Sequence, residues 1–255
     1  MQFIDTHCHL YLKEFNGDQA AVMERAKLTG VQKFFLPAID SEVLSDMLLM
    51  ESRYPENCFA MIGLHPCSVK DNVETELQLV KEWLAKRPFK AIGEIGLDFY
   101  WDITYAHRQI VAFEQQMELA LHYNLPVVIH TRNAMQQSIN IVQPFAGRGL
   151  QGIFHCFGDG IDMANKIIEM GFLLGIGGVV TYKKAGLAEV LADIELKYIV
   201  LETDAPYLSP VPYRGKRNES SYLIKIAEKI AEIKGISVEE VAEITTANAE
   251  KLFGL

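Results

Sequence analysis

Phe172-Leu173-Leu174-Gly175-Ile176 is an almost unbroken apolar run. A strand with one face in water alternates apolar and polar residues, so a continuous run indicates burial on both faces, which is typical of a parallel sheet covered by helices. Seven further strand-like runs lie at residues 2–9, 33–37, 59–64, 90–96, 126–130, 151–155 and 198–202. The chain therefore offers eight candidate strands.

Segments with apolar residues at helical spacing separate these runs, for example at residues 18–29, 76–86, 105–123 and 159–170. Several open on an Asp or Ser suited to capping. This alternation predicts a parallel sheet, and eight such units in 255 residues favour a closed (β/α)₈ TIM barrel. The open doubly wound alternative has no support, because no glycine-rich dinucleotide fingerprint follows the first strand.

The end of the chain completes this barrel rather than forming a second domain. A proline-rich loop at 206–221 precedes two helical stretches, 222–234 and 237–253, with Gly235 as a break between them. Because 49% of the residues are hydrophobic, the chain can bury one large core. We predict a single α/β domain spanning residues 1–255.

Composition limits the classes of function. A net charge of −9 argues against a protein that coats nucleic acid through bulk electrostatics, although it leaves room for a small phosphate-directed site. No leader-like start and no apolar run of about 18 residues are present, so we expect a cytoplasmic protein without membrane contact. The four cysteines lack paired C-x-x-C spacing, which favours reduced, buried thiols. No obligate protein partner is evident.

Six potential metal ligands stand at or just past the ends of these candidate strands. They are His7, His9, Glu94, His130, His155 and Asp204. The His-x-His pair sits where side chains alternate faces, so both imidazoles point the same way. Catalytic groups of TIM barrels lie at the carboxyl ends of the strands, and nitrogen with oxygen donors suits Zn²⁺, Mn²⁺ or similar ions.

Single histidines in such places are more often structural than ligating, but six donors on one rim are hard to attribute to packing. His65, after the third strand, either binds a substrate phosphate or orders its loop. His107 and His122 fall within a helical pattern and are expected at the surface or in packing.

The two carboxylates differ in their expected chemistry. Two ions about 3.5 to 4 Å apart need an anionic ligand between them, and Glu94 is best placed to bridge. Asp204 can both bind a metal and accept a proton from attacking water. Its alternative is a turn cap before Pro206. Asp98, Glu202 and Asp5 are candidates for supporting ligands or for turn residues.

Candidate substrate contacts are basic or amide side chains near these ligands. They are Arg132, Arg214, Lys216 and Asn218, the last three in the loop Tyr213-Arg214-Gly215-Lys216-Arg217-Asn218. Arginine forks match phosphate oxygens, but a basic loop is as often merely solvated. Phe99, Tyr100 and Trp101 could stack on bases or simply pack.

Seven ordered motifs closely resemble the TatD family of metal-dependent deoxyribonucleases. They are Ile4-Asp5-Thr6-His7-Cys8-His9-Leu10, Gly63-Leu64-His65-Pro66, Gly93-Glu94-Ile95-Gly96-Leu97-Asp98, Pro126-Val127-Val128-Ile129-His130-Thr131-Arg132, His155-Cys156-Phe157-Gly158, Glu202-Thr203-Asp204-Ala205-Pro206 and Arg214-Gly215-Lys216-Arg217-Asn218. The resemblance implies a barrel of the amidohydrolase type with two ions. It places one between His7, His9, Glu94 and Asp204, and the second between Glu94, His130 and His155.

The resemblance also implies 3′→5′ exonuclease action on DNA ends. Two residues depart from the family pattern: Trp101 stands where members often carry a polar or basic residue, and Ser220 stands where a proline is common. Two other functions remain open. One is hydrolysis of an aminoacyl-tRNA or a small amide or ester, which the basic loop disfavours. The other is a barrel that has lost catalysis, which the complete ligand set disfavours.

Overall fold

Eight parallel strands form the centre of the molecule. The computed structural model describes residues 1–255. Its strands are β1 (Phe3–Asp5), β2 (Val31–Pro37), β3 (Cys58–Met61), β4 (Ile92–Asp98), β5 (Val127–Arg132), β6 (Gly152–Phe154), β7 (Leu173–Ile176) and β8 (Ile199–Leu201). They pair in chain order, as β1-β2-β3 and as β4-β5-β6-β7-β8. The predicted alternation and parallel order are confirmed.

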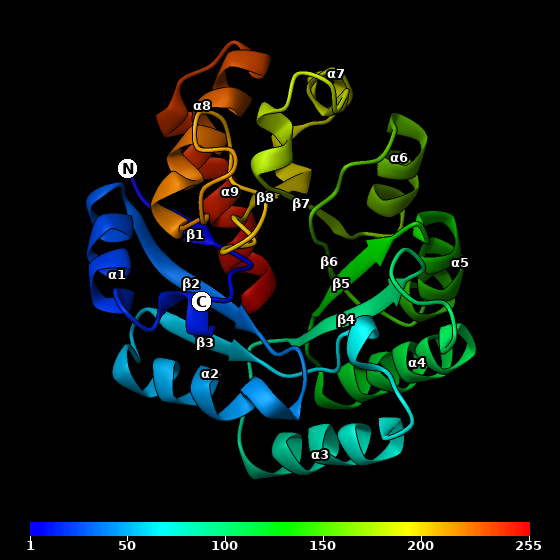
Figure 1. Ribbon diagram of the computed structural model, residues 1–255. Coiled ribbons are helices and arrows are strands. Elements are labelled where there is room, and N and C mark those ends of the chain that lie inside the picture. The colour runs from blue at the N-terminus through cyan, green and yellow to red at the C-terminus, as the bar shows by residue number, and fades with distance from the viewer.

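Backbone hydrogen bonds join these two groups into a closed ring. At the seam between β3 and β4, the amide of Ile62 donates to Ala91 and the amide of Gly93 donates to Ile62. At the seam between β8 and β1, Thr6 donates to Leu201 and His9 donates to Ala205. The protein is a TIM barrel, and Figure 1 shows its strands inside a ring of helices.

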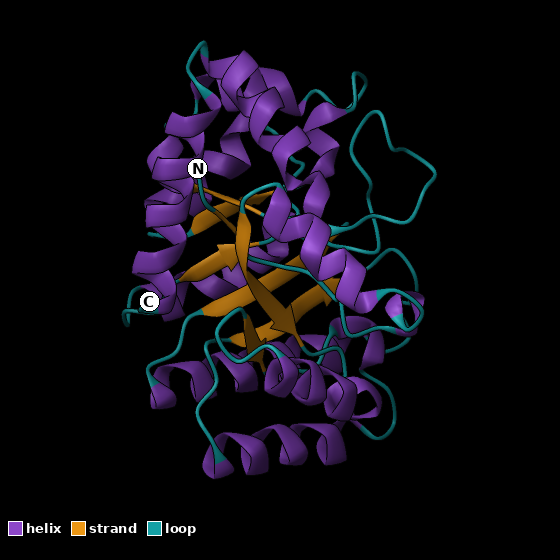
Figure 2. Ribbon diagram, turned by 90° about the vertical axis from the view of Figure 1, so that its left-hand side faces the viewer, coloured by secondary structure: helices purple, strands orange, loops and turns teal.

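Nine helices cover the barrel (Figure 2). They are α1 (Gln19–Leu28), α2 (Ser41–Arg53), α3 (Val73–Lys86), α4 (Ala106–Tyr123), α5 (Met135–Ala146), α6 (Ile161–Glu169), α7 (Leu187–Asp193), α8 (Leu223–Lys234) and α9 (Val238–Phe253). Ser237 caps α9 by accepting from the amide of Glu240 at 3.2 Å, and Gly235 ends α8 in a left-handed conformation. None of these helices is long and apolar enough to cross a membrane.

The last helix seals one end of the barrel. Ala249 and Phe253 of α9 pack against an interior layer that includes Ile4, Phe35 and Val200, and the Phe253 ring stacks on Phe35 at 3.8 Å. Lys90, just before β4, approaches the Phe253 carbonyl, so this end is the one where the strands begin. The carboxyl ends of the strands are left for the functional site.

Element boundaries differ from the sequence prediction in one informative way. Most strands are shorter than their apolar runs. β1 ends at Asp5, before the His-x-His pair, and β4 instead extends to Asp98. Glu94 therefore lies inside β4 and not at its end, which corrects the predicted position.

Candidate metal centre

The six predicted ligands converge at the carboxyl ends of the strands. His7 and His9 follow β1, His155 follows β6, and Asp204 follows β8 by three residues. Glu94 and His130 project from within β4 and β5. All six have low exposure, and the side chain of Asp204 is the most accessible carboxylate, at 14%.

The first group of donor atoms has the spacing of a tetrahedral site. The Nε2 atoms of His7 and His9 are 3.2 Å apart. The Nε2 atom of His7 lies 3.2 Å from Glu94 Oε2 and 3.7 Å from Asp204 Oδ1. The Nε2 atom of His9 lies 3.7 and 3.6 Å from the same two oxygens. Donors about 2.1 Å from a tetrahedral ion lie about 3.4 Å from one another, so these five separations, each of which includes an imidazole nitrogen, are compatible with Zn²⁺ or a similar ion.

The second group uses the other oxygen of the same glutamate. Glu94 Oε1 lies 3.0 Å from His130 Nδ1 and 2.8 Å from His155 Nε2. The two imidazole nitrogens are 3.4 Å apart, again the edge of a coordination polyhedron. Each oxygen of Glu94 therefore faces its own set of donors, which is the arrangement of a bridging carboxylate.

Supporting side chains orient the ring nitrogens of two histidines. Tyr11 donates its hydroxyl proton to the Pro37 carbonyl, so it accepts from His9 Nδ1 at 2.9 Å and leaves Nε2 with a free lone pair. Asp98 Oδ2 accepts from His130 Nε2 at 2.9 Å, which leaves Nδ1 facing Glu94. Such outer partners fix the tautomer of metal-binding histidines.

Glu202 lies beside a third histidine, His155, whose buried Nδ1 atom has no hydrogen-bond partner. Its Oε1 atom lies 3.5 Å from His155 Nδ1 and accepts a hydrogen bond from the amide of Cys156. Gly175 of β7 makes room for this carboxylate, because a Cβ atom there would lie 2.3 Å from Glu202 Oε2. The glycine in the run Phe172–Ile176 thus serves the site as well as the sheet.

His65 lies beside the cluster but has the wrong tautomer for a ligand. Its Nδ1 atom accepts a hydrogen bond from the amide of Cys67 at 3.0 Å. In a neutral imidazole the other nitrogen, Nε2, then carries the proton, and that atom lies 3.4 Å from Glu94 Oε1. His65 can therefore donate to an anion at the site but offers no lone pair to a cation.

The pKa values of the two carboxylates favour binding of positive charge in the cluster. Burial alone would raise the pKa of Glu94, but His155, His65 and His7 hold that pKa well below its ordinary value. Burial would likewise raise the pKa of Asp204, and its contact with His9 lowers it instead. Both carboxylates are ionised at neutral pH, so two buried negative charges require cationic or protonated neighbours.

Backbone geometry aims Asp204 at the cluster. Its φ of 56° lies in the left-handed region, which costs about 1 kcal/mol for a residue with a side chain. The amide of Asp204 donates to the His7 carbonyl at 2.9 Å. Just before it, Thr203 donates to the buried carboxylate of Asp5 through its amide and its hydroxyl. Ser220 donates to the same carboxylate at 2.6 Å, so Asp5 ties β1, the end of β8 and the following loop together.

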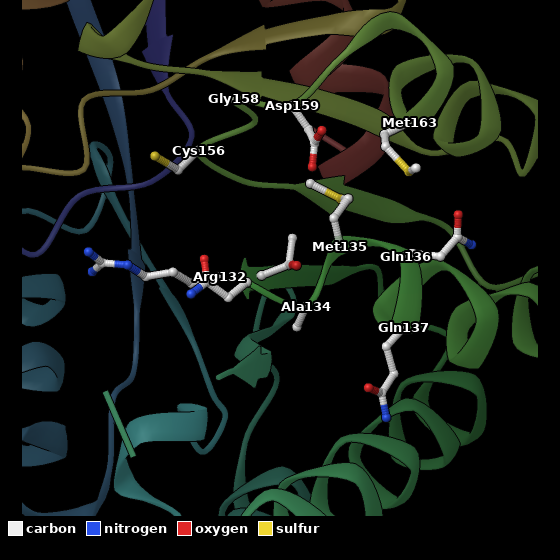
Figure 3. Close-up of a pocket in the computed structure, with 11 residues that line it drawn as sticks. Arg132, Ala134, Met135, Gln136, Gln137, Cys156, Gly158, Asp159 and Met163 are labelled. Atoms are coloured by element: carbon white, nitrogen blue, oxygen red, sulfur yellow. The ribbon is translucent and has the colours of Figure 1, made fainter. Parts of the chain in front are cut away.

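A cavity of about 840 Å³ opens above the donors. Its lining includes His9, His65, Glu94, His130, His155, Asp204, Asp98, Trp101, Arg132, Tyr207 and Leu208. A second cavity of about 510 Å³ adjoins it and shares Thr131, Arg132 and Cys156. Figure 3 shows this second cavity, with Arg132 extending away from Gln136 and Gln137.

The predicted basic and amide substrate contacts fall into three groups. Arg132 lines both cavities. Arg214 and Lys216 are exposed and do not line the metal cavity, so their roles stay predictions. The prediction that Asn218 contacts substrate is corrected, because this residue is fully buried. Its side-chain amide donates to the carbonyls of Thr203 and Tyr207.

Sequence reasoning missed Tyr11 and left Asp98 and Glu202 undecided between support and turn roles. Tyr11 could have been found, because it continues the alternate spacing of His7 and His9. The bonds of Asp98 and Glu202 depend on contacts between strands distant in sequence. All four cysteines are free, as expected, but Cys67 and Cys156 are only partly buried.

A closed β/α barrel with histidines and carboxylates gathered at the carboxyl ends of its strands defines the class of metal-dependent barrel hydrolases. Comparison with known sequences narrows this class. The profile of the family "TatD related DNase" matches residues 4–254. This chain belongs to the TatD-related DNase family.

Known relatives share the full length of the chain. It is 39% identical to YabD of Bacillus subtilis, described as an uncharacterized metal-dependent hydrolase, over 98% of both chains. The crystal structure of YjjV, a TatD homologue from Escherichia coli, is similar with a TM-score of 0.93 and 29% identity, covering 99% of this chain and 98% of that one. A TatD-family hydrolase from Entamoeba histolytica has the same fold, with a TM-score of 0.85, 22% identity and coverage of 99% and 98%.

Proposed function

We propose that this protein is a DNA phosphodiesterase that holds two divalent cations and removes nucleotides from 3′ ends. The observation that supports the proposal most strongly is the position of the Glu94 carboxylate, whose two oxygens face two separate sets of donor atoms. The bound cations would lower the pKa of water and offset phosphate charge. The family name, which is that of DNases, supports DNA as the substrate.

The chain's own residues supply the remaining steps. Asp204 is ionised, lies at the first donor set and is the more accessible carboxylate, so it orients the attacking water and accepts its proton. His65 presents Nε2–H and Arg132 presents its guanidinium to the phosphate oxygens. These donors stabilise the charge that develops on the transferred phosphoryl group.

Digestion of end-labelled single-stranded and duplex DNA with Mg²⁺, Mn²⁺ or Zn²⁺ tests this proposal. The expected result is a ladder of products shortened from the 3′ end. Asp204→Asn should fold normally and lower kcat by at least about 100-fold, because a positioned base contributes about 10² to 10⁴. His122→Ala, at an exposed position of α4, is the matched control.

Absence of any ladder with all three ions would contradict the proposal. A parallel panel of aminoacyl-tRNA and small ester or amide substrates separates it from the deacylase alternative. Cleavage of that panel without cleavage of DNA would favour the alternative.

A further inference from the structure

The loop between β4 and α4 exposes large apolar side chains beside the metal cavity. Tyr100, Trp101 and Ile103 are 52%, 67% and 67% exposed. Exposed aromatic groups that gather at a cavity usually mark a binding surface, because leaving them in water forgoes the gain from burial. Trp101 lines the metal cavity, and Tyr100 meets it in a T-shaped contact and not in a stacked one.

Arg132 is held against this aromatic surface without a counter-ion. Its guanidinium carbon lies 3.9 Å from the centre of the Tyr100 ring and 5.1 Å from that of Trp101. The two rings meet nearly at right angles, at 85°, so the cation occupies the corner between them. No carboxylate lies within ion-pair distance of Arg132, in contrast to Arg25, Arg87, Arg108, Arg148 and Arg217. An oriented, unpaired cation at a cavity fits an anionic ligand.

The same aspartate that supports a metal-site histidine fixes the position of the loop. Asp98 Oδ2 accepts from His130, while Asp98 Oδ1 accepts from the amides of Tyr100 at 2.9 Å and Trp101 at 3.2 Å. Because Asp98 contacts both the loop and His130, the aromatic surface has a fixed position relative to the metal-binding residues. Such preorganisation reduces the entropy lost when a ligand binds.

We propose that Trp101 and Arg132 form a nucleotide subsite, in which a base stacks on the indole and the adjoining phosphate contacts the guanidinium. This inference rests on the proposed function and specifies how its substrate is held. The cavity, at about 840 Å³, has the volume of a small-ligand site. Tyr207 and Leu208, from the loop after β8, line the same cavity on the opposite side of an eight-stranded ring. A base must leave its duplex partner to stack there, so the subsite selects unpaired ends.

Fluorescence reports the stacking directly. The chain has two tryptophans, so in a Trp83→Phe background Trp101 is the sole tryptophan. We titrate the zinc-loaded protein with a hexathymidylate joined by phosphorothioate linkages, which resist hydrolysis. The expected result is saturable quenching of Trp101 fluorescence, and an abasic oligomer of equal length should cause little. Equal responses to both oligomers, or none, would overturn the subsite.

Kinetics provide the second measurement. In Trp101→Ala the ratio of kcat/KM for hexathymidylate to that for the abasic oligomer should fall about 5- to 150-fold, and Trp101→Phe should restore part of it. Ile103→Ala is the matched control, since Ile103 is equally exposed on the same loop but does not line the cavity. Equal loss on both oligomers means that Trp101 does not bind the base. Failure of the wild type to cleave either oligomer refutes the proposed function, while the quenching experiment still decides the subsite.

Discussion

The loop after β8 and the carboxyl end of β5 each carry an arginine, Arg217 and Arg132, but only Arg132 lines the metal cavity. Arg217, in the loop after β8, forks onto Asp18 with two contacts of 2.8 Å and also donates to the Glu14 carbonyl. The guanidinium of Arg132, at the end of β5, lies over the rings of Tyr100 and Trp101 and has no ion-pair partner. A basic motif therefore indicates phosphate binding only where its arginines do not already form ion pairs with carboxylates of the same protein.

The partners of Arg217 belong to a network that docks the loop onto α1. Arg25 of α1 donates to both carboxylate oxygens of Glu219, at 2.8 and 2.6 Å. Asp18 precedes α1 but does not cap it, because its carboxylate is occupied by Arg217 and Arg25. Arg217 and Glu219 therefore anchor the loop after β8 to α1, whereas Arg214 and Lys216 of the same loop stay exposed.

Replacing each arginine by alanine should give opposite profiles, and among the variants that test this comparison these should show the largest effect. Arg132→Ala should lower kcat/KM for DNA about 10- to 100-fold, because a hydrogen bond to a charged group contributes about 1.5 to 3 kcal/mol. Its Tm should stay near that of the wild type, since Arg132 is exposed. Steady-state kinetics and thermal unfolding measure both quantities.

Arg217→Ala is the paired variant for this test. It should lower the Tm and leave kcat/KM within a few fold of the wild type. An equal loss of kcat/KM in the two variants would remove the distinction between the two regions.

The sequence was sufficient for those features that depend on local pattern. Apolar runs and helical spacing predicted the barrel, and the residues that end these runs gave the six donors that the structure brings together. Contacts between residues distant along the chain could not be predicted from the sequence. Nothing in the sequence indicates that Arg217 meets Asp18 or that Asn218 meets Thr203, because folding alone brings these segments together. Residue types common to ligand binding and to buried networks are therefore the ones that sequence reasoning assigned wrongly, as with Asn218.

Asn218→Ala extends the comparison to a buried residue of the loop after β8. The change leaves the carbonyls of Thr203 and Tyr207 without their donor, and it should lower the free energy of unfolding by about 1 to 3 kcal/mol. Urea unfolding measures this loss. Asn140→Ala, at an exposed position of α5, is the control and should change stability by less than about 0.5 kcal/mol. If Asn218→Ala keeps full stability but raises KM for DNA, Asn218 is a substrate contact after all.

The smallest effect concerns the charge of Asp18 itself. Its hydrogen bond with Arg217 lowers its pKa from 3.8 to about 2. Because the pKa is depressed in the folded state, the stabilisation is fully present above the unfolded pKa and is lost as pH falls from about 4 toward 2. The carboxylate is 37% exposed, so solvent screening keeps the contribution below about 1 kcal/mol. The stability difference between wild type and Asp18→Asn should therefore shrink across that pH window, and a constant difference would mean that the contact with Arg217 does not depend on the charge of Asp18.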